Sequence, residues 1–329
     1  MVRLYPFLLL LFFASAQACE LGVYTYDSIA GRGGLGPVIF PEFEKLTGCK
    51  VRIIASGDAV QVLSRVEIDL KRGKPPADVI LGVDALNWDR ARKVSDPGFA
   101  LEAENLKQVD PAIQKYLPEL PGFLPIDFGA MTFMMDSSSV TRAPDSIEDL
   151  LKGYWKKRFI LEDPRTSSPG LQFLLFTKQV LGKKFGDFWF QLKAQRLAMP
   201  PGWDTAYGLF LKGEAPLVWS YVTSEAYHRE HGSTRYRAVL LRDGQPLQIE
   251  GALIVRGASN PELARRFLNF LFSDWVQARI ATTNWMWPAK KTGVLPGSFA
   301  SLPRIARPLF LSGVDSASVL KEWSEAIHR

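Results

Sequence analysis

Short apolar runs alternate with helix-like segments in the first part of the chain. Three runs have the length of strands and are rich in β-branched and aromatic residues: 21–26 (LGVYTY), 51–56 (VRIIAS) and 77–83 (ADVILGV). The segments between them, 36–48 and 58–73, have the sequence of helices, and the first ends at Gly48. This alternation predicts a parallel sheet with helices on both faces.

The later part of the chain repeats the alternation. Residues 158–182 have the order strand, turn and helix, and residues 215–228 have a strand followed by a helical exit. Two further strand-like passages, 125–138 and 248–257, are predicted to cross between the halves. Two α/β units joined in this way predict two lobes around a cleft. We expect lobe A to comprise residues 19–125 plus 251–275, and lobe B residues 126–250 plus 276–329.

The first 18 residues have the three parts of a secretory signal peptide: Arg3, an apolar run over 7–13, and Ala16-Gln17-Ala18. The apolar run is too short to span a bilayer. Cleavage after Ala18 would leave Cys19 first, as in lipid-anchored proteins, but Ala16 and Gln17 fit such a signal poorly. We therefore expect a soluble, exported protein rather than one that begins with a buried helix.

Composition narrows the class of protein. Hydrophobic residues make up 47% of the chain and charged residues 22%, which is typical of a globular protein. The formal net charge of +6 is spread along the chain, with one short basic cluster at residues 156–158, so we expect no nucleic-acid partner. Both cysteines, Cys19 and Cys49, precede strand-like runs. If those strands are parallel neighbours, an oxidising compartment makes a disulfide between them plausible.

Ligands of parallel sheets collect at the carboxyl ends of the strands, which here carry Tyr26-Asp27, Gly57-Asp58 and Asp84. Residues 31–36 match the dinucleotide-binding pattern G-x-G-x-x-G, and Asp58 keeps that interpretation open. However, residues 27–30 separate the first glycine from the strand, and Pro37 is expected as the first helical residue with Gly36 near the N-cap. We therefore interpret the glycines as a loop that faces the cleft.

The segment 163–170 (DPRTSSPG) has the sequence of a helix start, with Ser168 as the expected N-cap and Pro169 as the first helical residue. Free N–H groups and the hydroxyls of Ser167 and Ser168 suit an anion such as phosphate, although capping alone explains part of the pattern.

Several aromatic residues fall outside helical stripes. Trp203 and Trp285 lie in turn-like settings, the latter beside Asn284, and Tyr207, Tyr221 and Tyr227 lie near them in sequence. Such rings suit a flat, cationic heteroaromatic ligand, with Asp58 available to balance its charge. Trp219, Trp287 and Phe210 are expected in the core.

Catalytic patterns are sparse. His228 and His231 could share a helix face, but no cysteine or clear carboxylate completes a zinc site. There is no G-x-S-x-G elbow, and the cysteines belong to the wrong end of the sheet for a nucleophile. We expect a binding protein without a cofactor, metal or enzymatic activity.

The segments VYTYDS, ADVILGVD, DPRTSSPGL, GWDTAYGLFLKGE, SYVTSEAYH and TTNWMWP together resemble the periplasmic thiamine-binding proteins of bacterial ABC importers, in order across nearly the whole mature chain. The resemblance implies an α/β, two-lobed periplasmic binding protein fold, with mixed and parallel sheets and flanking helices around a central ligand cleft. It implies a monomer that binds thiamine, thiamine monophosphate or thiamine diphosphate and delivers it to an inner-membrane permease with its ATPase.

Carried over to this chain, the family's ligand residues fall on Tyr26, Asp58, Ser167, Trp203, Tyr221, Tyr227 and Trp285, to which we add Asp27, Ser168 and Asn284 as neighbours. One departure is Gly33, which stands where the family has a tryptophan, next to an additional Arg32. Two alternatives remain: a binding protein for ferric ion or another cationic heterocycle, and a secreted thiamine-degrading transferase that would need a cysteine nucleophile in the cleft.

Overall fold

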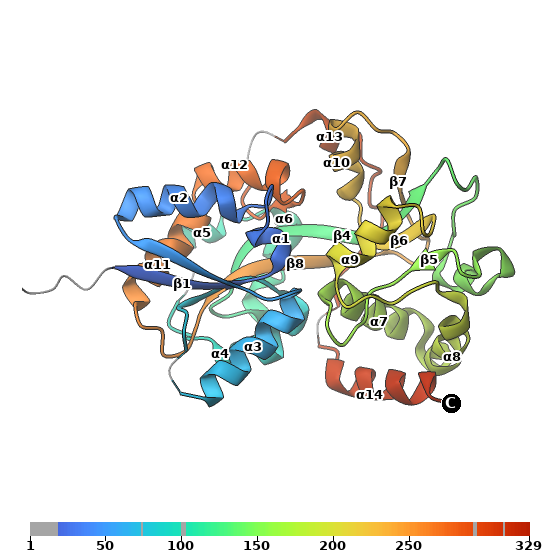
Figure 1. Ribbon diagram of the computed structural model, residues 1–329, viewed down its shortest axis with the longest axis horizontal. Coiled ribbons are helices and arrows are strands. Elements are labelled where there is room, and N and C mark those ends of the chain that lie inside the picture. Colours follow the sequence, from blue (N-terminus) through green and yellow to red (C-terminus); the bar gives the residue numbers. More distant parts are fainter. Residues whose placement is uncertain (1–18, 74, 100–102, 292–294, 312) are drawn as a thin grey trace, which may run out of the picture.

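Ten strands form one continuous sheet that passes through both lobes of the molecule (Figure 1). The computed structural model describes residues 19–329 except 74, 100–102, 292–294 and 312, so the expected signal peptide over 1–18 lies outside the described residues. The strand order is β2-β1-β3-β8-β4-β6-β5, with β7 and β9 paired to β4 and β10 paired to β8. The strands are β1 (Glu20–Thr25), β2 (Lys50–Ala55), β3 (Val79–Asp84), β4 (Leu124–Asp136), β5 (Phe159–Ile160), β6 (Leu217–Tyr221), β7 (Tyr236–Val239), β8 (Gln245–Ile254), β9 (Trp287–Pro288) and β10 (Pro308–Leu309).

Helices cover both faces of the sheet. Those of the first half are α1 (Asp27–Ala30), α2 (Gly36–Thr47), α3 (Ala59–Lys71), α4 (Trp88–Val94), α5 (Ala103–Leu106) and α6 (Pro111–Gln114). Those of the second half are α7 (Ser168–Leu181), α8 (Phe185–Gln195), α9 (Trp203–Leu211), α10 (Ser224–Glu230), α11 (Pro261–Leu271), α12 (Asp274–Thr283), α13 (Gly297–Ala300) and α14 (Ser316–Ile327).

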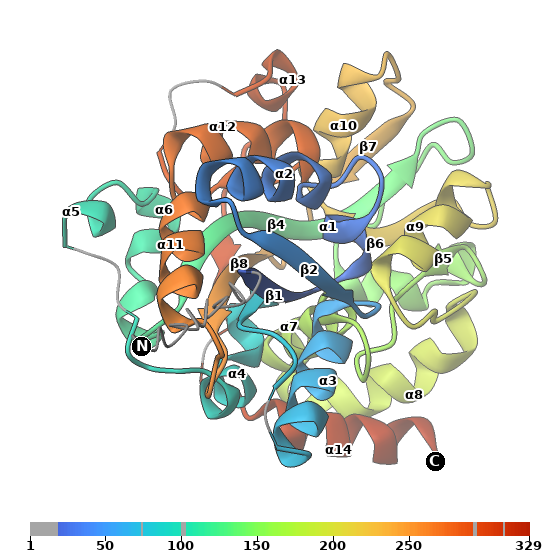
Figure 2. The same cartoon turned by 60° about the vertical axis from the view of Figure 1, so that its left-hand side comes forward.

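The strand–helix alternation predicted for the first part of the chain is confirmed. Strand β1 pairs in parallel with both β2 and β3, and helices α2 and α3 lie on opposite faces of these strands (Figures 1 and 2). Helix α2 ends at Gly48, whose φ of 72° suits a residue without a side chain. It begins at Gly36, with Leu35 as the N-cap, so the expectation that Pro37 is the first helical residue is one position too late. Proline fits there because the first turn needs no internal N–H donors.

Two long antiparallel strands, β4 and β8, join the lobes, as predicted for residues 125–138 and 248–257. The first half of β4 pairs with β8, and its second half, from Met131 onward, pairs with β6 and β7. Strand β8 also pairs with β3 of lobe A, so it forms the centre of the sheet. Figure 1 shows both strands running from the lobe of α2 and α3 into the lobe of α7 and α9.

Each lobe has its own hydrophobic core. The core of lobe A includes Val276, Ile280 and Met286, which come from α12 and the segment after it. The boundary expected at residue 275 is therefore too early, because α12 packs against α11 and the lobe A core instead of crossing to lobe B. The core of lobe B gathers apolar side chains of α7, α8 and α14 on one face of the sheet, and α9 covers the other face.

A disulfide joins Cys19 and Cys49 at the amino ends of β1 and β2. It lies at the edge of the sheet opposite to the one that carries Tyr26 and Asp58, because parallel strands share a direction. None of the helices in the described part of the chain has the length and apolar character needed to cross a lipid bilayer.

Candidate ligand-binding site

Three carboxylates stand in one row across the strands that join the lobes. Glu250 of β8 is paired with Asp84 of β3 on one side and with Asp127 of β4 on the other. Residues paired across neighbouring strands point to the same face and lie close enough to interact. All three residues are buried, with exposed fractions of 6% or less. We call these residues the carboxylate row.

Two β-bulges create this row. The register of β3 against β8 shifts between Leu81 and Val83, and that of β4 against β8 shifts between Pro125 and Asp127. Along β8, the shift of β3 falls between the partners Ala252 and Gly251, and the shift of β4 falls between Gly251 and Glu250, so the two bulges lie on either side of Gly251. Bulges turn neighbouring side chains to new directions and are frequent beside functional sites.

The row is connected to tyrosines of both lobes. The hydroxyl of Tyr26, at the end of β1, donates a hydrogen bond of 2.6 Å to Oε2 of Glu250. Nε2 of Gln248 donates to the hydroxyl of Tyr221, at the end of β6, and to Oε1 of Glu250, both at 2.8 Å. Gly82 has a φ of 92°, and a Cβ there would lie 2.3 Å from the ring of Tyr26, so only glycine lets this ring lie against β3.

The structure shows no basic side chain of the described residues paired with these carboxylates. Among the described residues, the ion pairs do not include Asp84, Asp127 or Glu250. Burial raises the pKa of Asp127 to about 7 and that of Asp84 above its ordinary value. Burial and the Asp127 charge raise the pKa of Glu250 well above its ordinary value. A cation placed at the row would favour the ionised forms.

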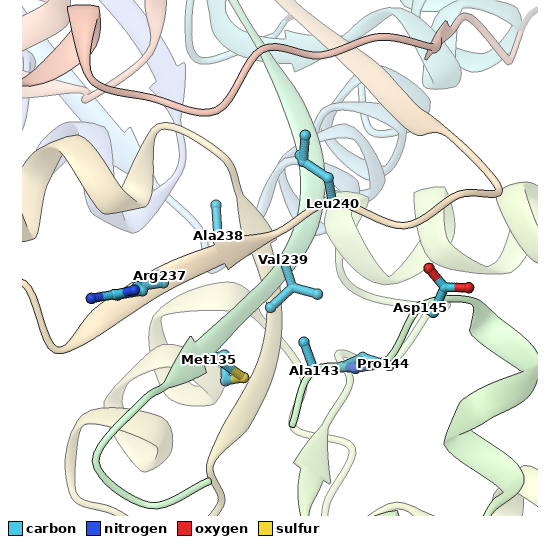
Figure 3. A pocket seen from close by; sticks show the side chains of 8 residues that line it. All are labelled: Met135, Ala143, Pro144, Asp145, Arg237, Ala238, Val239 and Leu240. Carbon is cyan, nitrogen blue, oxygen red and sulfur yellow. The ribbon is translucent and has the colours of Figure 1, made fainter. Parts of the chain in front are cut away.

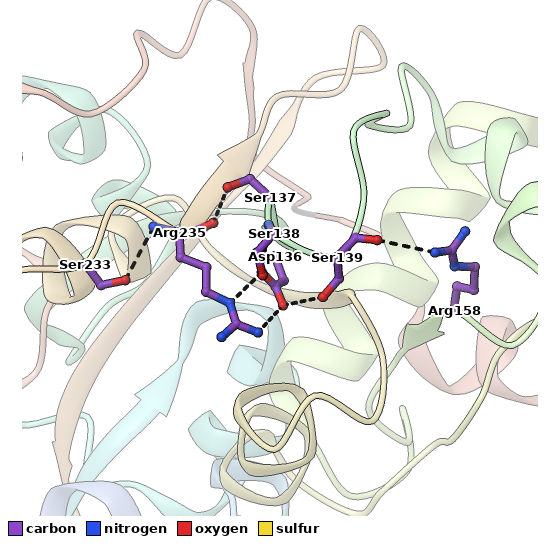
Figure 4. Close-up of polar contacts among 7 residues, drawn as sticks. All are labelled: Asp136, Ser137, Ser138, Ser139, Arg158, Ser233 and Arg235. Carbon is purple, nitrogen blue, oxygen red and sulfur yellow. Dashed lines mark hydrogen bonds and ion pairs between the residues drawn. The ribbon is translucent and has the colours of Figure 1, made fainter.

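Asp136, at the other end of β4, shows how a basic partner changes the pKa of a buried carboxyl group. It accepts hydrogen bonds from Arg235, Ser138 and Ser139 (Figure 4). The Arg235 guanidinium holds the pKa of Asp136 well below its ordinary value. Asp127 and Asp136 lie on the same strand, and the hydrogen bonds from Arg235 are the main cause of the lowered pKa of Asp136.

Asp58 connects lobe A to two helices of lobe B. Its Oδ2 accepts hydrogen bonds from the Ser167 hydroxyl at 2.9 Å and from the backbone N–H of Trp203 at 3.4 Å. Burial raises the pKa of Asp58 to about 6 against the opposing effect of these hydrogen bonds. Ser168 adds a second connection between the lobes, since its hydroxyl bonds to Oδ2 of Asp84.

The N-cap of α7 is Ser167, whose hydroxyl accepts from the N–H of Gly170, and Ser168 is the first helical residue. The expectation that Ser168 is the N-cap is therefore wrong by one position. Both serines have the chemistry of a cap, and only the backbone of Ser167, which is extended, leaves its side chain free to turn back onto the first turn.

The aromatic candidates form a continuous series of ring contacts. Trp203 stacks on Tyr207 at 4.7 Å, and Tyr207 stacks on His228 and bonds to its Nε2 through a contact of 2.8 Å. Tyr227 meets His228 and then Trp285, each with an edge-to-face geometry at 5.1 Å. Burial lowers the pKa of His228 to about 4, so this ring is neutral near pH 7.

The remaining candidates lie at the rim or behind the row. Nδ2 of Asn284 donates to Asp127 Oδ2 at 2.7 Å, so it contacts the row and not the aromatic series. Trp285 has a φ of 54°, which is rare for a residue with a side chain and turns the chain after α12. Asp27 is exposed at the start of α1. Trp219 and Phe210 are buried as expected, whereas Trp287 is only partly buried.

The sequence pattern identified Asp84 as the end of a strand but not as a site residue. It also did not single out four other residues of the site: Asp127, Glu162, Gln248 and Glu250. A signal was present, because Asp127 and Glu250 are acidic residues in the interior of long, mostly apolar strands. Charged residues are seldom fully buried without a reason.

A surface hollow of about 370 Å³ lies away from these residues. It is lined by side chains of β4, β7 and the segment 143–145 in lobe B (Figure 3). Its walls are mostly apolar, and Arg237 and Asp145 are its charged residues. Within the described residues, no group of three or more His, Cys, Asp and Glu side chains is arranged to hold a metal ion.

Known proteins are similar to this chain over most of its length. The sequence model for bacterial extracellular solute-binding proteins matches residues 39–307. A thiamine-binding periplasmic protein of Brucella abortus is 38% identical, covering 94% of this chain and 91% of its own. One from Escherichia coli is 36% identical, with 94% of each chain covered. The solved structure of a periplasmic thiamin-binding protein has a TM-score of 0.83 and 35% identity, covering 96% of this chain and 98% of its own.

Proposed function

We infer the function from family membership, because the chain belongs to the bacterial extracellular solute-binding proteins and, among them, to the periplasmic thiamine-binding proteins. We propose that it binds thiamine, or a phosphate ester of thiamine, between its lobes. The bound solute is then delivered to an inner-membrane permease driven by an ATPase.

The observation that carries this proposal is the carboxylate row. Asp84, Glu250 and Asp127 place three acidic groups at the junction of the lobes without a basic partner among the described residues. Thiamine carries a permanent positive charge on its thiazolium ring and an amino group on its pyrimidine ring. The charge offsets the repulsion within the row. The amino group offers hydrogen-bond donors to carboxylate oxygens such as Asp127 Oδ1, which is buried and has no partner among the described residues.

The aromatic series supplies the second feature that a flat cation requires. Trp203 and Tyr221 lie 6.4 Å apart at the ends of α9 and β6, and each is only partly buried. Rings in this setting stack on heteroaromatic ligands and attract cations through their faces. The ligand residues proposed are therefore Tyr26, Asp58, Trp203, Tyr221 and the row, with Tyr227 and Trp285 at the rim.

Delivery in the periplasm agrees with the relatives, which are periplasmic binding proteins. We propose export by a signal peptide cleaved after Ala18 and action as a monomer. Strands β4 and β8 act as the hinge, since both extend into the two lobes and pass directly beside the row. Ser167 donates a hydrogen bond to Asp58, and Ser168 donates one to Asp84. These two bonds hold the lobes together in the closed arrangement, in which the lobes meet around the ligand.

The two alternatives have less support. A cysteine-dependent thiamine-degrading transferase has no residue for the nucleophile, because the two cysteines of the chain are joined at the opposite edge of the sheet. A ferric site needs several hard oxygen ligands around one point. Tyr221 bonds to Gln248, whereas Tyr227 is 36% exposed and packs on Trp285. The two tyrosines therefore lie in different surroundings and do not point to one shared metal position.

Calorimetric titration of ligand-stripped protein with thiamine, thiamine monophosphate and thiamine diphosphate tests the proposal. We expect binding of at least one of them at micromolar or tighter concentration, which corresponds to about −8 kcal/mol or better. The absence of heat and of any thermal stabilisation with all three compounds would refute it.

A further inference from the structure

The excess positive charge of the chain lies in two segments that the fold brings together in lobe B. Residues 147–160 and 183–197 carry eight basic and three acidic residues, which is a net charge of +5. The formal net charge of the whole chain is +6, and Arg3 contributes one further positive charge, so all other residues together are electrically balanced. Along the sequence only the short run at 156–158 marks this concentration, because the two segments are more than twenty positions apart.

Hydrogen bonds join the two segments beside β5, at the end of lobe B that lies away from lobe A (Figure 1). The backbone N–H of Lys157 donates to the carbonyl of Gln195, and its Nζ donates to the carbonyl of Arg196 at 3.1 Å. The N–H of Leu197 donates to the carbonyl of Phe159 at 2.8 Å. Lys157 has a φ of 58°, in the left-handed region that residues with a side chain seldom adopt. The basic run is therefore held in one defined conformation, at a cost in backbone strain.

The acidic residues of the two segments leave most of these cations unpaired. Each of the three has one basic partner: Glu148 pairs with Lys184, Asp149 with Lys152, and Asp187 with Arg329. Among the ion pairs of the described residues, none includes residues 156–158 or Lys193. The guanidinium of Arg158 lies 4.7 Å from the centre of the Tyr154 ring and donates to the carbonyl of Ser139 (Figure 4). Neither contact neutralises its charge.

Large apolar side chains are exposed beside these cations. Tyr154 is 38% exposed, Phe190 47% and Leu197 38%. Phe190, Lys193 and Leu197 follow one another at spacings of three and four residues along α8 and the turn after it, so they lie on one side of the helix. We call Tyr154, Phe190 and Leu197, together with residues 156–158 and Lys193, the basic surface. Cations interleaved with exposed rings are typical of protein surfaces that lie on anionic membranes, because lipid phosphates attract the cations while the rings enter the interface.

We propose that the basic surface binds the headgroups of anionic phospholipids, so that the end of lobe B lies on a membrane surface. A lipid surface requires charge and exposed apolar side chains but no fixed complementary shape, and the hollow of Figure 3 is lined by other residues. None of the proposed ligand residues belongs to either segment, so binding to lipid leaves the junction of the lobes free. The inference goes beyond solute binding and does not depend on which solute the protein carries.

Co-sedimentation of residues 19–329 with lipid vesicles tests the proposal. The probes are phosphatidylcholine vesicles with and without about 30% phosphatidylglycerol. We expect the wild type to bind the anionic vesicles at least about tenfold more tightly than the neutral ones, and to lose most of this binding in about 0.5 M salt, which screens the charges.

A charge variant and a matched control locate the binding. Lys156→Gln/Lys157→Gln/Arg158→Gln should weaken binding to the anionic vesicles at least about tenfold, because each cation near such a surface contributes about fivefold. The control, Lys71→Gln/Arg72→Gln/Lys93→Gln, also removes two lysines and one arginine. These three lie at exposed positions of lobe A and enter none of the ion pairs of the described residues. The control should retain binding within about threefold.

Three outcomes would overturn the inference. Equal binding of the wild type to neutral and anionic vesicles would do so, as would no binding to either, and neither result needs a variant to fold. Equal losses in the folded charge variant and the control would also overturn it, because binding would then follow the net charge alone. Thiamine affinity measured by calorimetry should be the same in the charge variant and the wild type, so the proposed function and this inference can fail independently.

Discussion

The hydroxyl of Ser167 donates to Oδ2 of Asp58 across 2.9 Å, so the start of a helix in lobe B is bonded to the end of a strand in lobe A. Each partner also stabilises its own helix. Ser167 caps α7, and Asp58 caps α3 by accepting from the N–H of Ala59. The contact between lobes therefore uses two side chains whose positions are already fixed within their own lobes, which reduces the entropy lost when the lobes meet.

Replacement of Ser167 by alanine should weaken binding and stability together. Loss of the cap should lower the free energy of unfolding by about 1 kcal/mol. Loss of the bond to Asp58 should additionally weaken thiamine binding severalfold, because one contact of the closed arrangement is removed. Ser273→Ala is the matched control, since Ser273 caps α12 through an equivalent 3.4 Å bond and its hydrogen bonds among the described residues are made with α11 and α12. Calorimetry and urea unfolding of both variants give the comparison, and equal binding losses would contradict the role assigned to Ser167.

The aromatic series should contribute to affinity without being required for folding. Trp203→Ala and Trp285→Ala are each expected to weaken thiamine binding about tenfold through lost stacking and cation–π attraction. Both rings are only partly buried, so the far-ultraviolet circular dichroism spectrum should be retained. Trp275→Ala serves as the control, because Trp275 is partly buried against Phe270 and Arg279 outside the site. Unchanged affinity in both site variants would exclude the proposed aromatic wall.

The carboxylate row should make the ligand-free protein less stable as the pH rises. The folded protein holds a proton on Asp127 up to a pKa of about 7, whereas the unfolded chain releases it near the ordinary value of 3.8. Between these values the folded state binds more protons, so the free energy of unfolding falls with increasing pH by up to about 1.4 kcal/mol per pH unit for this group. His228 acts in the opposite direction, because its pKa is lowered by burial to about 4.

Asp127→Asn isolates this contribution from that of His228. Relative to the wild type, the variant should gain stability steadily from about pH 4 to about pH 7, as measured by urea unfolding across that range. Asp127 faces Glu250 and Asn284, and Tyr26 lies within reach of its charge, and none of these three neighbours is cationic. A difference in stability that stays constant with pH would show that Asp127 does not titrate in this range.

The disulfide should stabilise the fold without affecting the ligand. It closes a segment of 30 residues, which in the chain-entropy account corresponds to about 3–4 kcal/mol. Cys19→Ser/Cys49→Ser should lower the free energy of unfolding by that amount in urea titrations and leave thiamine affinity within about twofold, since the bridge lies at the other edge of the sheet from the site. A large loss of affinity in the folded double variant would indicate that lobe A changes shape without it.

Local features of the fold could be predicted from the sequence because local physical chemistry decides them. The first three strands are apolar runs of fixed length, Gly48 supplies the left-handed helix end, and the crossing strands read as long apolar passages. Start positions of helices were less certain. In SSPG two neighbouring serines both suit the cap, and only the backbone angles around Ser167 decide between them.

The centre of the site could not be derived in the same way. That Asp84, Glu250 and Asp127 form one row depends on which strands are neighbours and on two register shifts opposite Gly251. These residues are separated by up to 166 positions along the chain (250 minus 84), so no local pattern relates them. The contacts that Asp58, the cap of α3, makes with Ser167 and Trp203 at the starts of α7 and α9 likewise depend on how the lobes meet.

Strand β4 contributes side chains to the cores of both lobes, with Leu124 and Phe128 in one and Met131 and Phe133 in the other. Neither lobe can therefore be excised as an independent folding unit, and unfolding should proceed as one cooperative transition. The same continuity restricts how such a protein changes its ligand. Recombination between relatives would have to cut β4 and β8 beside the carboxylates, so new specificity has to arise by substitution within the site and not by exchange of a lobe.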